Sequence, residues 1–407
     1  MDNNSSLADQ AVRRNAFVLT AATAFGGAIM PVAITLGGLS GAYLLGADKS
    51  LATMPVTALT VGSALATIPA ATLMSRVGRR WGFVIGAMPA ALGGLLATYA
   101  LLQDLFWLFA GALLLIGVSA AFNQQYRFAA VDGGSEVART RALALVMGGG
   151  VLSAVIGPQT AIFTRDLFQP IPFAGGFLAI SVLALVASTI VSRLRNIAPP
   201  RRARDGAQLR GRPLAEIARQ PRFVAAVLCG ICSYALMTFV MTAAPLAMVG
   251  CGLSQSNAAL GIQWHVLAMF GPSFFTGKLI VRFGKDRIVI AGMALLTACA
   301  VVAISGLSLS HFWIALVLLG LGWNFGFIGA TAMLTETYRP EEKGRVQGLN
   351  DFLVFASSAV ASFFAGTLIN GPGWAFINAI VFPVVIVCLI VLAWTALLRR
   401  GAVPEAL

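Results

Sequence analysis

Long apolar runs recur from one end of this 407-residue chain to the other, and charged residues gather between them. A helix of about 20 apolar residues crosses the roughly 30 Å hydrocarbon layer of a bilayer. The composition is far from that of a soluble domain, because only 11% of the residues are charged and 58% are hydrophobic. Since the bilayer core offers no water to the backbone, such spans must be helical. The sequence predicts an all-α integral membrane protein.

Charged residues and Gly or Pro clusters divide the chain into twelve apolar runs, six in each half. The predicted spans are Ala16 to Leu45, Leu51 to Met74, Gly82 to Leu102, Leu105 to Tyr126, Ala142 to Phe163, Phe173 to Val191, Phe223 to Val249, Asn257 to Ile280, Ile288 to Leu309, Phe312 to Leu334, Gln347 to Ile369 and Ala375 to Leu398. Residues 1–192 form one predicted six-helix half and residues 223–407 the other. The Arg-rich segment 193–222 predicts a cytoplasmic linker, in which Leu214 to Gln220 forms a short surface helix.

The basic residues set the orientation. In this arrangement 26 of the 28 Lys and Arg residues fall on the side that holds both termini, and only Lys49 and Arg165 fall on the other. Cytoplasmic loops carry the excess of Lys and Arg in membrane proteins. The sequence therefore predicts a multi-pass protein of the cytoplasmic (inner) membrane with both termini in the cytoplasm. The same asymmetry explains the net charge of +13, so a nucleic-acid role is excluded.

A weak internal repeat relates the two halves. The segment ATLMSRVGRR at 71–80 recurs as GKLIVRFGKD at 277–286, and Gly117, Ala121 and Phe122 recur as Gly322, Gly326 and Phe327. Transporters built from two fused, pseudo-symmetric six-helix bundles show such repeats.

At these residues the chain resembles the major facilitator superfamily, whose signature after the second span reads Gly-x-Leu-Ala-Asp-Arg-x-Gly-Arg-Arg or Lys. The matching residues are Leu73, Arg76, Gly78, Arg79 and Arg80 in the first copy, and Gly277, Leu279, Arg282, Gly284 and Lys285 in the second. The resemblance covers the whole chain and implies a bacterial-type secondary transporter in which this motif forms a cytoplasmic gate. Ser75 and Val281 stand where the signature has Asp, so the usual brace lacks its carboxylate.

Asp351 is the only acidic residue inside a predicted span. A buried ionisable group is costly and is usually paired. The hypothesis favoured by the sequence is a gate pair that Asp351 forms across the two halves with Arg76 or the Ser75 loop. Proton coupling through Asp351, or a hydrated position without a partner, are the alternatives. Asp132 and Glu336 are the expected partners of the two Arg clusters.

The fifth span resembles the Gly-rich signature of proton-coupled drug antiporters of the same superfamily. It carries Gly148, Gly149 and Gly150 and then Gly157-Pro158, although Ala161 and Ile162 replace two further glycines. This resemblance slightly favours export. Physically, the pattern provides close helix packing and a kink.

Substrate contacts are expected on the spans that line the central cavity in this family. In the fourth span Asn123, Gln124 and Arg127 are costly in lipid, and Asn123 and Arg127 share a face. The alternative is that the helix ends here with Arg127 reaching to the membrane surface. The other candidates are Gln263, Trp264 and His265 of the eighth span, Tyr234 and Thr238 of the seventh, and Trp323 and Asn324 of the tenth. His265 could carry a proton or serve packing.

No enzyme motif, phosphate-binding loop or metal-binding cluster is present in the sequence, which predicts neither cofactor nor metal. The function predicted is secondary active transport of a small organic solute by alternating access. We expect a functional monomer whose transport is coupled to protons, with export slightly favoured. The alternatives are an uptake permease for a metabolite or vitamin-like aromatic compound, and a transporter-fold sensor or accessory protein that does not transport.

Overall fold

A computed structural model describes residues 2–130, 132, 135–195, 211–339 and 341–401 of the chain. Residues 196–210, half of the predicted linker, lie outside the described residues. The described part is all-α. Its helices are α1 (Asp2–Gly26), α2 (Ile29–Leu45), α3 (Met54–Leu102), α4 (Phe106–Asn123), α5 (Tyr126–Ala129), α6 (Glu136–Thr164), α7 (Ala174–Val191), α8 (Leu214–Ala218), α9 (Pro221–Gly250), α10 (Gln255–Phe270), α11 (Ser273–Phe283), α12 (Lys285–Ser305), α13 (Leu309–Leu334), α14 (Lys343–Asn370), α15 (Trp374–Ala379) and α16 (Val381–Gly401).

These helices make the twelve predicted spans, which confirms the predicted fold. Ten helical segments of the described chain are long and apolar enough to cross a membrane, and the pair α10–α11, bent by 43°, makes an eleventh. The twelfth comes from α3, whose 49 residues are broken at Gly78 into two spans. The first span consists of α1 and α2, and the last of α15 and α16. The large apolar side chains exposed on the outside, such as Leu65 and Phe163, suit a lipid environment.

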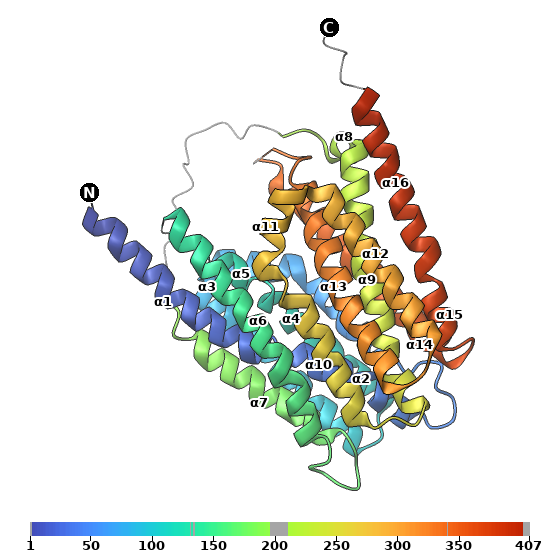
Figure 1. The fold of residues 1–407 in the computed structure, drawn as a ribbon. Helices are drawn as coiled ribbons and strands as arrows, with labels where there is room; N and C mark the ends of the chain where they lie inside the picture. Colours follow the sequence, from blue (N-terminus) through green and yellow to red (C-terminus); the bar gives the residue numbers. More distant parts are fainter. Residues whose placement is uncertain (1, 131, 133–134, 196–210, 340, 402–407) are drawn as a thin grey trace.

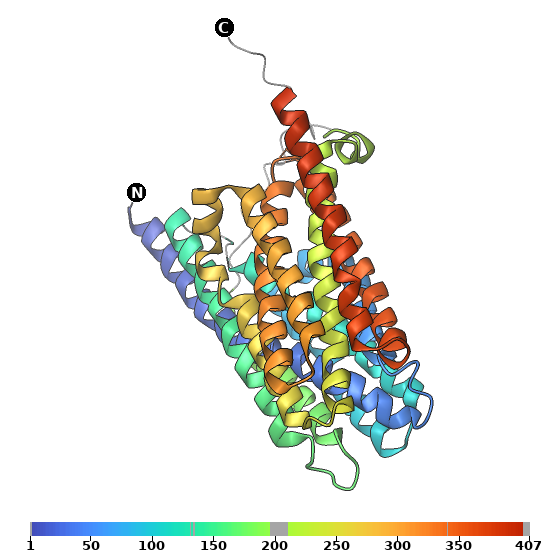
Figure 2. The same cartoon turned by 45° about the vertical axis from the view of Figure 1, so that its right-hand side comes forward.

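Helices α1 to α7 form an N-terminal bundle and α9 to α16 a C-terminal bundle, each with its own buried core. The start of α1 and the end of α16 lie at the same end of the molecule, called here the terminal end (Figure 1). The view turned by 45° shows the same arrangement, with α16 along the outside of the C-terminal bundle (Figure 2). An even number of spans accounts for the shared end.

Hydrogen bonds join the two bundles at the end opposite the terminal end. Thr53, before α3, donates to the carbonyl oxygen of Ser362 in α14 at 3.0 Å. Gln159 of α6 donates to Gln263 of α10 at 2.8 Å, and Asn370 donates to the carbonyl of Lys49 at 2.8 Å. The bundle ribbons diverge toward the terminal end (Figure 1). The crossing pairs α3–α14 and α6–α10 therefore close the molecule at the opposite end.

The two copies of the repeated motif adopt the same backbone turn. Gly78 has φ 82° and Gly284 has φ 87°. Positive φ values favour glycine, because glycine has no Cβ. The expected acidic partners are confirmed within each bundle. Arg79 pairs with Asp132 at 3.0 Å, and Glu336 binds Lys285 at 2.9 Å and Arg222 at 2.7 Å, while Arg222 also pairs with Asp286.

The remaining motif side chains lie near the surface at this end. Ser75 is exposed and donates to the carbonyl of Thr72 at 2.7 Å. Arg80 and Arg282 lie over the neighbouring rings of Trp81 and Phe283, each at 5.3 Å. Arg76 is exposed.

The C-terminal end of the linker is fixed to the C-terminal bundle by Glu342, just before α14. Its side chain is fully buried and accepts bonds from the Arg212 guanidinium at 2.8 and 3.0 Å and from the backbone N–H groups of Arg212 and Arg339 at 2.8 Å. The short helix α8, predicted over Leu214 to Gln220, follows directly and buries Ile217. These contacts hold the linker against the loop before α14.

Substituting Glu342 by Gln is expected to lower the thermal stability at neutral pH. The Arg212 guanidinium, followed by the backbone donor of Arg339, lowers the pKa of Glu342 from 4.5 to about 2. A depressed folded-state pKa contributes stability above the unfolded value of about 4.5, which is lost as the pH falls toward 2. The melting temperature of the wild type, followed in detergent, should therefore contain a fall between about pH 4.5 and pH 2 that the variant lacks. Equal melting temperatures of the two proteins at pH 7 would contradict this role for Glu342.

Candidate functional site

A cavity of about 290 Å³ lies between the two bundles. Its walls come from α1, α2, α3, α4, α5 and α6 on one side and from α9, α10, α13 and α14 on the other. Most of its lining is apolar, with a few polar groups, as is usual for sites that hold small organic ligands. Its volume is near the lower limit of such pockets, about 300 Å³. The position between the bundles makes it the candidate substrate site.

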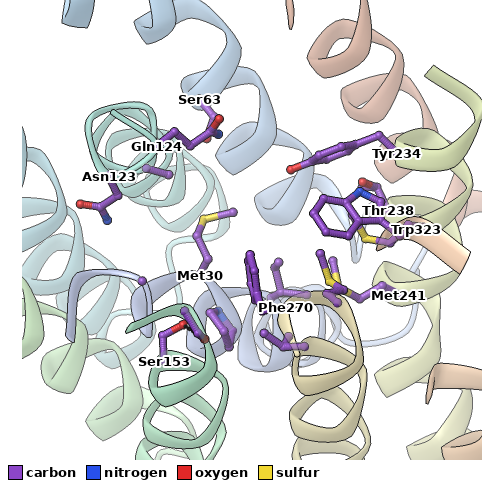
Figure 3. Close-up of a pocket in the computed structure, with 18 of the residues that line it drawn as sticks. Met30, Ser63, Asn123, Gln124, Ser153, Tyr234, Thr238, Met241, Phe270 and Trp323 are labelled. Atoms are coloured by element: carbon purple, nitrogen blue, oxygen red, sulfur yellow. Dashed lines mark hydrogen bonds between the residues drawn. The ribbon is translucent and has the colours of Figure 1, made fainter. Parts of the chain in front are cut away.

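The C-terminal bundle provides an aromatic wall, which consists of Tyr234, Phe270, Trp323, Phe327 and Phe355. Trp323 stacks on Phe327 with ring centroids 5.3 Å apart and planes at 17°, and Tyr234 meets Trp323 edge-on at 5.7 Å. Thr238 and Met241 lie beside these rings (Figure 3). Trp323 is only 7% exposed, yet its indole N–H has no hydrogen-bond partner among the described residues. A buried donor without a partner is costly, so it is available to a ligand acceptor.

The N-terminal bundle faces this wall with flexible and polar side chains. Met30, Ser63 and Gln124 lie across the cavity from Tyr234 and Trp323 (Figure 3). Asn123 also lines the cavity, but its amide donates to the carbonyl of Gly26 at 2.9 Å, where the first span breaks between α1 and α2. Asn123 therefore stabilises the break.

Arg127 and Asp351 are the two charged residues that line the cavity, and they come from opposite bundles. Arg127 is exposed, and Asp351 is partly buried and accepts a bond from Asn350 at 3.2 Å. Opposite charges in one cavity attract each other, and Tyr234 lines the same cavity. The structure thus places Asp351 in the cavity, and Arg127 is the positively charged residue that lines the same cavity.

Three predicted contact residues of the eighth span lie outside the cavity lining. Gln263 bonds to Gln159 at the interface of the bundles, and Trp264 is 44% exposed on the outer surface. His265 is fully buried between α10 and α13, where its Nδ1–H donates to the carbonyl of Leu316 at 2.9 Å. Its surroundings are those of a packing histidine, the alternative that the sequence left open.

Asn324, also predicted as a contact, is fully buried at the break between α10 and α11. Pro272 bends this span, and the carbonyl of Met269 accepts from the Asn324 amide at 2.6 Å. The same amide donates to Ser273 at 2.8 Å and accepts from Thr276 at 2.6 Å. Asn324 therefore replaces helical hydrogen bonding at the kink, one residue along from the cavity residue Trp323.

Sequence reasoning missed Phe270, Phe355 and Met147 as lining residues. Each stands in an apolar run among similar residues, so composition alone does not distinguish it. The helical spacing of Phe355 from Asp351, four residues apart on α14, is the one pattern that places it on the same face. No group of three or more His, Cys, Asp or Glu side chains that could hold a metal occurs in the described part of the chain.

Comparison with known proteins agrees with this architecture. A riboflavin transporter, RfnT, of Brucella anthropi is 49% identical over 398 residues, covering 97% of this chain and 99% of that protein. YddS of Bacillus subtilis, an uncharacterised transporter of the major facilitator type, is 29% identical, and the match covers 93% of this chain and 91% of that protein. The crystal structure of the human organic anion transporter MFSD10 matches the fold with a TM-score of 0.64 at 14% identity, over 94% of this chain and 99% of that one.

The family itself is shown by its sequence profile. The profile of the major facilitator superfamily matches residues 16–272 and 227–406, which together cover nearly the whole chain. The structure agrees with this match, since it has the two turns of the repeated motif and two six-helix bundles. The chain therefore belongs to the major facilitator superfamily and is a membrane transporter, not an enzyme.

Proposed function

We propose that this protein carries riboflavin, or a flavin close to it, into the cell. The observation that carries the proposal is the 49% identity to the riboflavin transporter, which extends over almost the full length of both proteins. This favours the uptake of a vitamin-like aromatic compound over the export that the fifth span suggested.

The cavity chemistry supports a flavin. The isoalloxazine ring is planar, uncharged and aromatic, so it can pack against the rings of Trp323, Tyr234 and Phe327. Its carbonyl oxygens are acceptors for a donor such as the unpaired Trp323 N–H. The polyhydroxyl chain requires polar partners, which Gln124, Arg127 and Asp351 provide.

Helix packing explains the Gly-rich fifth span without export. A Cβ at Gly149 would come within 2.5 Å of the carbonyl oxygen of Thr20, and one at Gly157 within 2.7 Å of that of Ala28. Both glycines allow α6 to approach the first span closely. The signature therefore gives no independent support for an exporter.

The proposed orientation follows the positive-inside rule. With 26 of 28 basic residues assigned to the terminal end, that end and both termini lie in the cytoplasm of the proposed inner-membrane protein. The bundles then approach each other at the outer side, and alternating access requires the reverse arrangement to admit external substrate. Labelling of Cys251, which is exposed at the opposite end, by an impermeant thiol reagent in intact cells tests this orientation.

The function is tested by expressing the gene in a bacterial riboflavin auxotroph that has no flavin importer of its own. We expect growth on low external riboflavin and accumulation of labelled riboflavin, which excess unlabelled riboflavin abolishes. Repeating the assay with a protonophore tests proton coupling. A purified protein that neither binds riboflavin nor moves it in proteoliposomes would contradict the proposal.

A further inference from the structure

The two charged residues of the cavity belong to different bundles and are not joined in an ion pair. No guanidinium nitrogen of Arg127 lies within 4.0 Å of a carboxylate oxygen of Asp351, although both side chains are described. Asn350 occupies only one oxygen of Asp351. The guanidinium of Arg127 therefore offers hydrogen-bond donors to the cavity, and the second carboxylate oxygen of Asp351 offers an acceptor.

This arrangement suits neighbouring hydroxyl groups. A hydroxyl both donates and accepts, so one can accept from Arg127 while the next donates to Asp351. Tyr234 lines the same cavity as both charged residues and also belongs to the aromatic wall. A planar ring held at that wall would thus extend a polyhydroxyl chain toward the charged pair.

The negative charge of Asp351 also affects which ligands the cavity can hold. The predicted cytoplasmic end is strongly basic, which draws anionic metabolites toward the cavity. Arg127 alone would retain a phosphate group, whereas the carboxylate of Asp351 repels it. With both residues present the charged lining sums to zero, which suits an uncharged ligand.

We propose that Arg127 and Asp351 together form a subsite for the polyhydroxyl chain of the ligand, and that Asp351 makes this subsite reject phosphorylated ligands. This inference rests on the proposed function and assigns a specificity role to the two residues. It predicts discrimination between riboflavin and riboflavin 5′-phosphate, which differ by a phosphate carrying a charge of about −1.5 to −2 at neutral pH.

The experiment measures quenching of flavin fluorescence by the purified protein. We expect the wild type to bind riboflavin 5′-phosphate at least about tenfold more weakly than riboflavin, and Asp351→Asn to reduce this ratio to about threefold or less. Asp132→Asn removes the same charge at the same end outside the cavity, so it should leave the ratio at its wild-type value. An unchanged ratio in Asp351→Asn would overturn the inference.

A second measurement does not depend on the folding of Asp351→Asn. Lumichrome has the flavin ring system without the polyhydroxyl chain. Arg127→Gln should weaken riboflavin binding at least about tenfold and leave lumichrome binding unchanged. Equal loss of affinity for both ligands would overturn the subsite. The proposed function would still stand in that case, as long as the wild type binds riboflavin. Absence of riboflavin binding by the wild type would overturn both.

Discussion

Replacing Trp323 by Ala is expected to weaken riboflavin binding at least about thirtyfold. Trp323 is stacked on Phe327 and contacts Tyr234 and Phe270, so its loss opens the centre of the aromatic wall. Truncation of a central aromatic residue in a binding site costs about 2 kcal/mol or more, and each 1.4 kcal/mol is tenfold in affinity. The substitution also removes the unpaired indole N–H that a ligand carbonyl would satisfy. Titration of flavin fluorescence measures the effect.

A matched control is available in the eighth span. Trp264→Ala removes the same side chain from the outer surface, where Trp264 is 44% exposed and lines no part of the cavity. It should leave riboflavin affinity within about twofold of the wild type, since surface substitutions usually change little. Trp323→Phe should recover part of the affinity, because it restores a ring without the N–H. If Trp264→Ala and Trp323→Ala weakened binding equally, the aromatic wall would not be the flavin site.

The second large effect is expected for stability. Asn324→Ala removes three hydrogen bonds, two of them fully buried, at the bend between α10 and α11. It also leaves the carbonyl of Met269 without its side-chain donor. Each such bond contributes about 1 kcal/mol, so the loss is about 2–3 kcal/mol. Such a loss lowers the melting temperature by several degrees. Thermal unfolding of the purified protein in detergent measures it.

Asn123→Ala serves as the comparison, because Asn123 makes a single bond, to Gly26, at the break in the first span. Its melting temperature should fall by less than half as much. A fall for Asn324→Ala no larger than that for Asn123→Ala would show that the bend of α10–α11 does not depend on the amide. The pair of variants also distinguishes a structural loss from a loss of ligand contact, since the measurement contains no ligand.

The sequence predicted the fold because a bilayer leaves few alternatives. Apolar length fixed the spans, and the repeated Gly78 and Gly284 marked the two turns that the structure confirms. The acidic partner of Arg79 was predicted as well, since Asp132 lies at the matching end of its bundle. These features depend on local composition and on which end of a span a residue occupies.

The sequence did not separate ligand contacts from packing. Trp323 and Asn324 are neighbours, yet one lines the cavity and the other stabilises a kink in α10–α11. His265 and Trp264 are neighbours too, and one is buried between helices while the other faces outward. A helix turns about 100° per residue, so adjacent residues point into different surroundings.

Composition and span length therefore determined from the sequence alone that this is a twelve-span membrane protein, because the cost of exposing backbone groups to lipid applies to every residue. Only the tertiary structure decided that Arg127 and Asp351 share a cavity with Tyr234 and Trp323. These residues come from four separate spans, and their meeting depends on how the two bundles are rotated and packed.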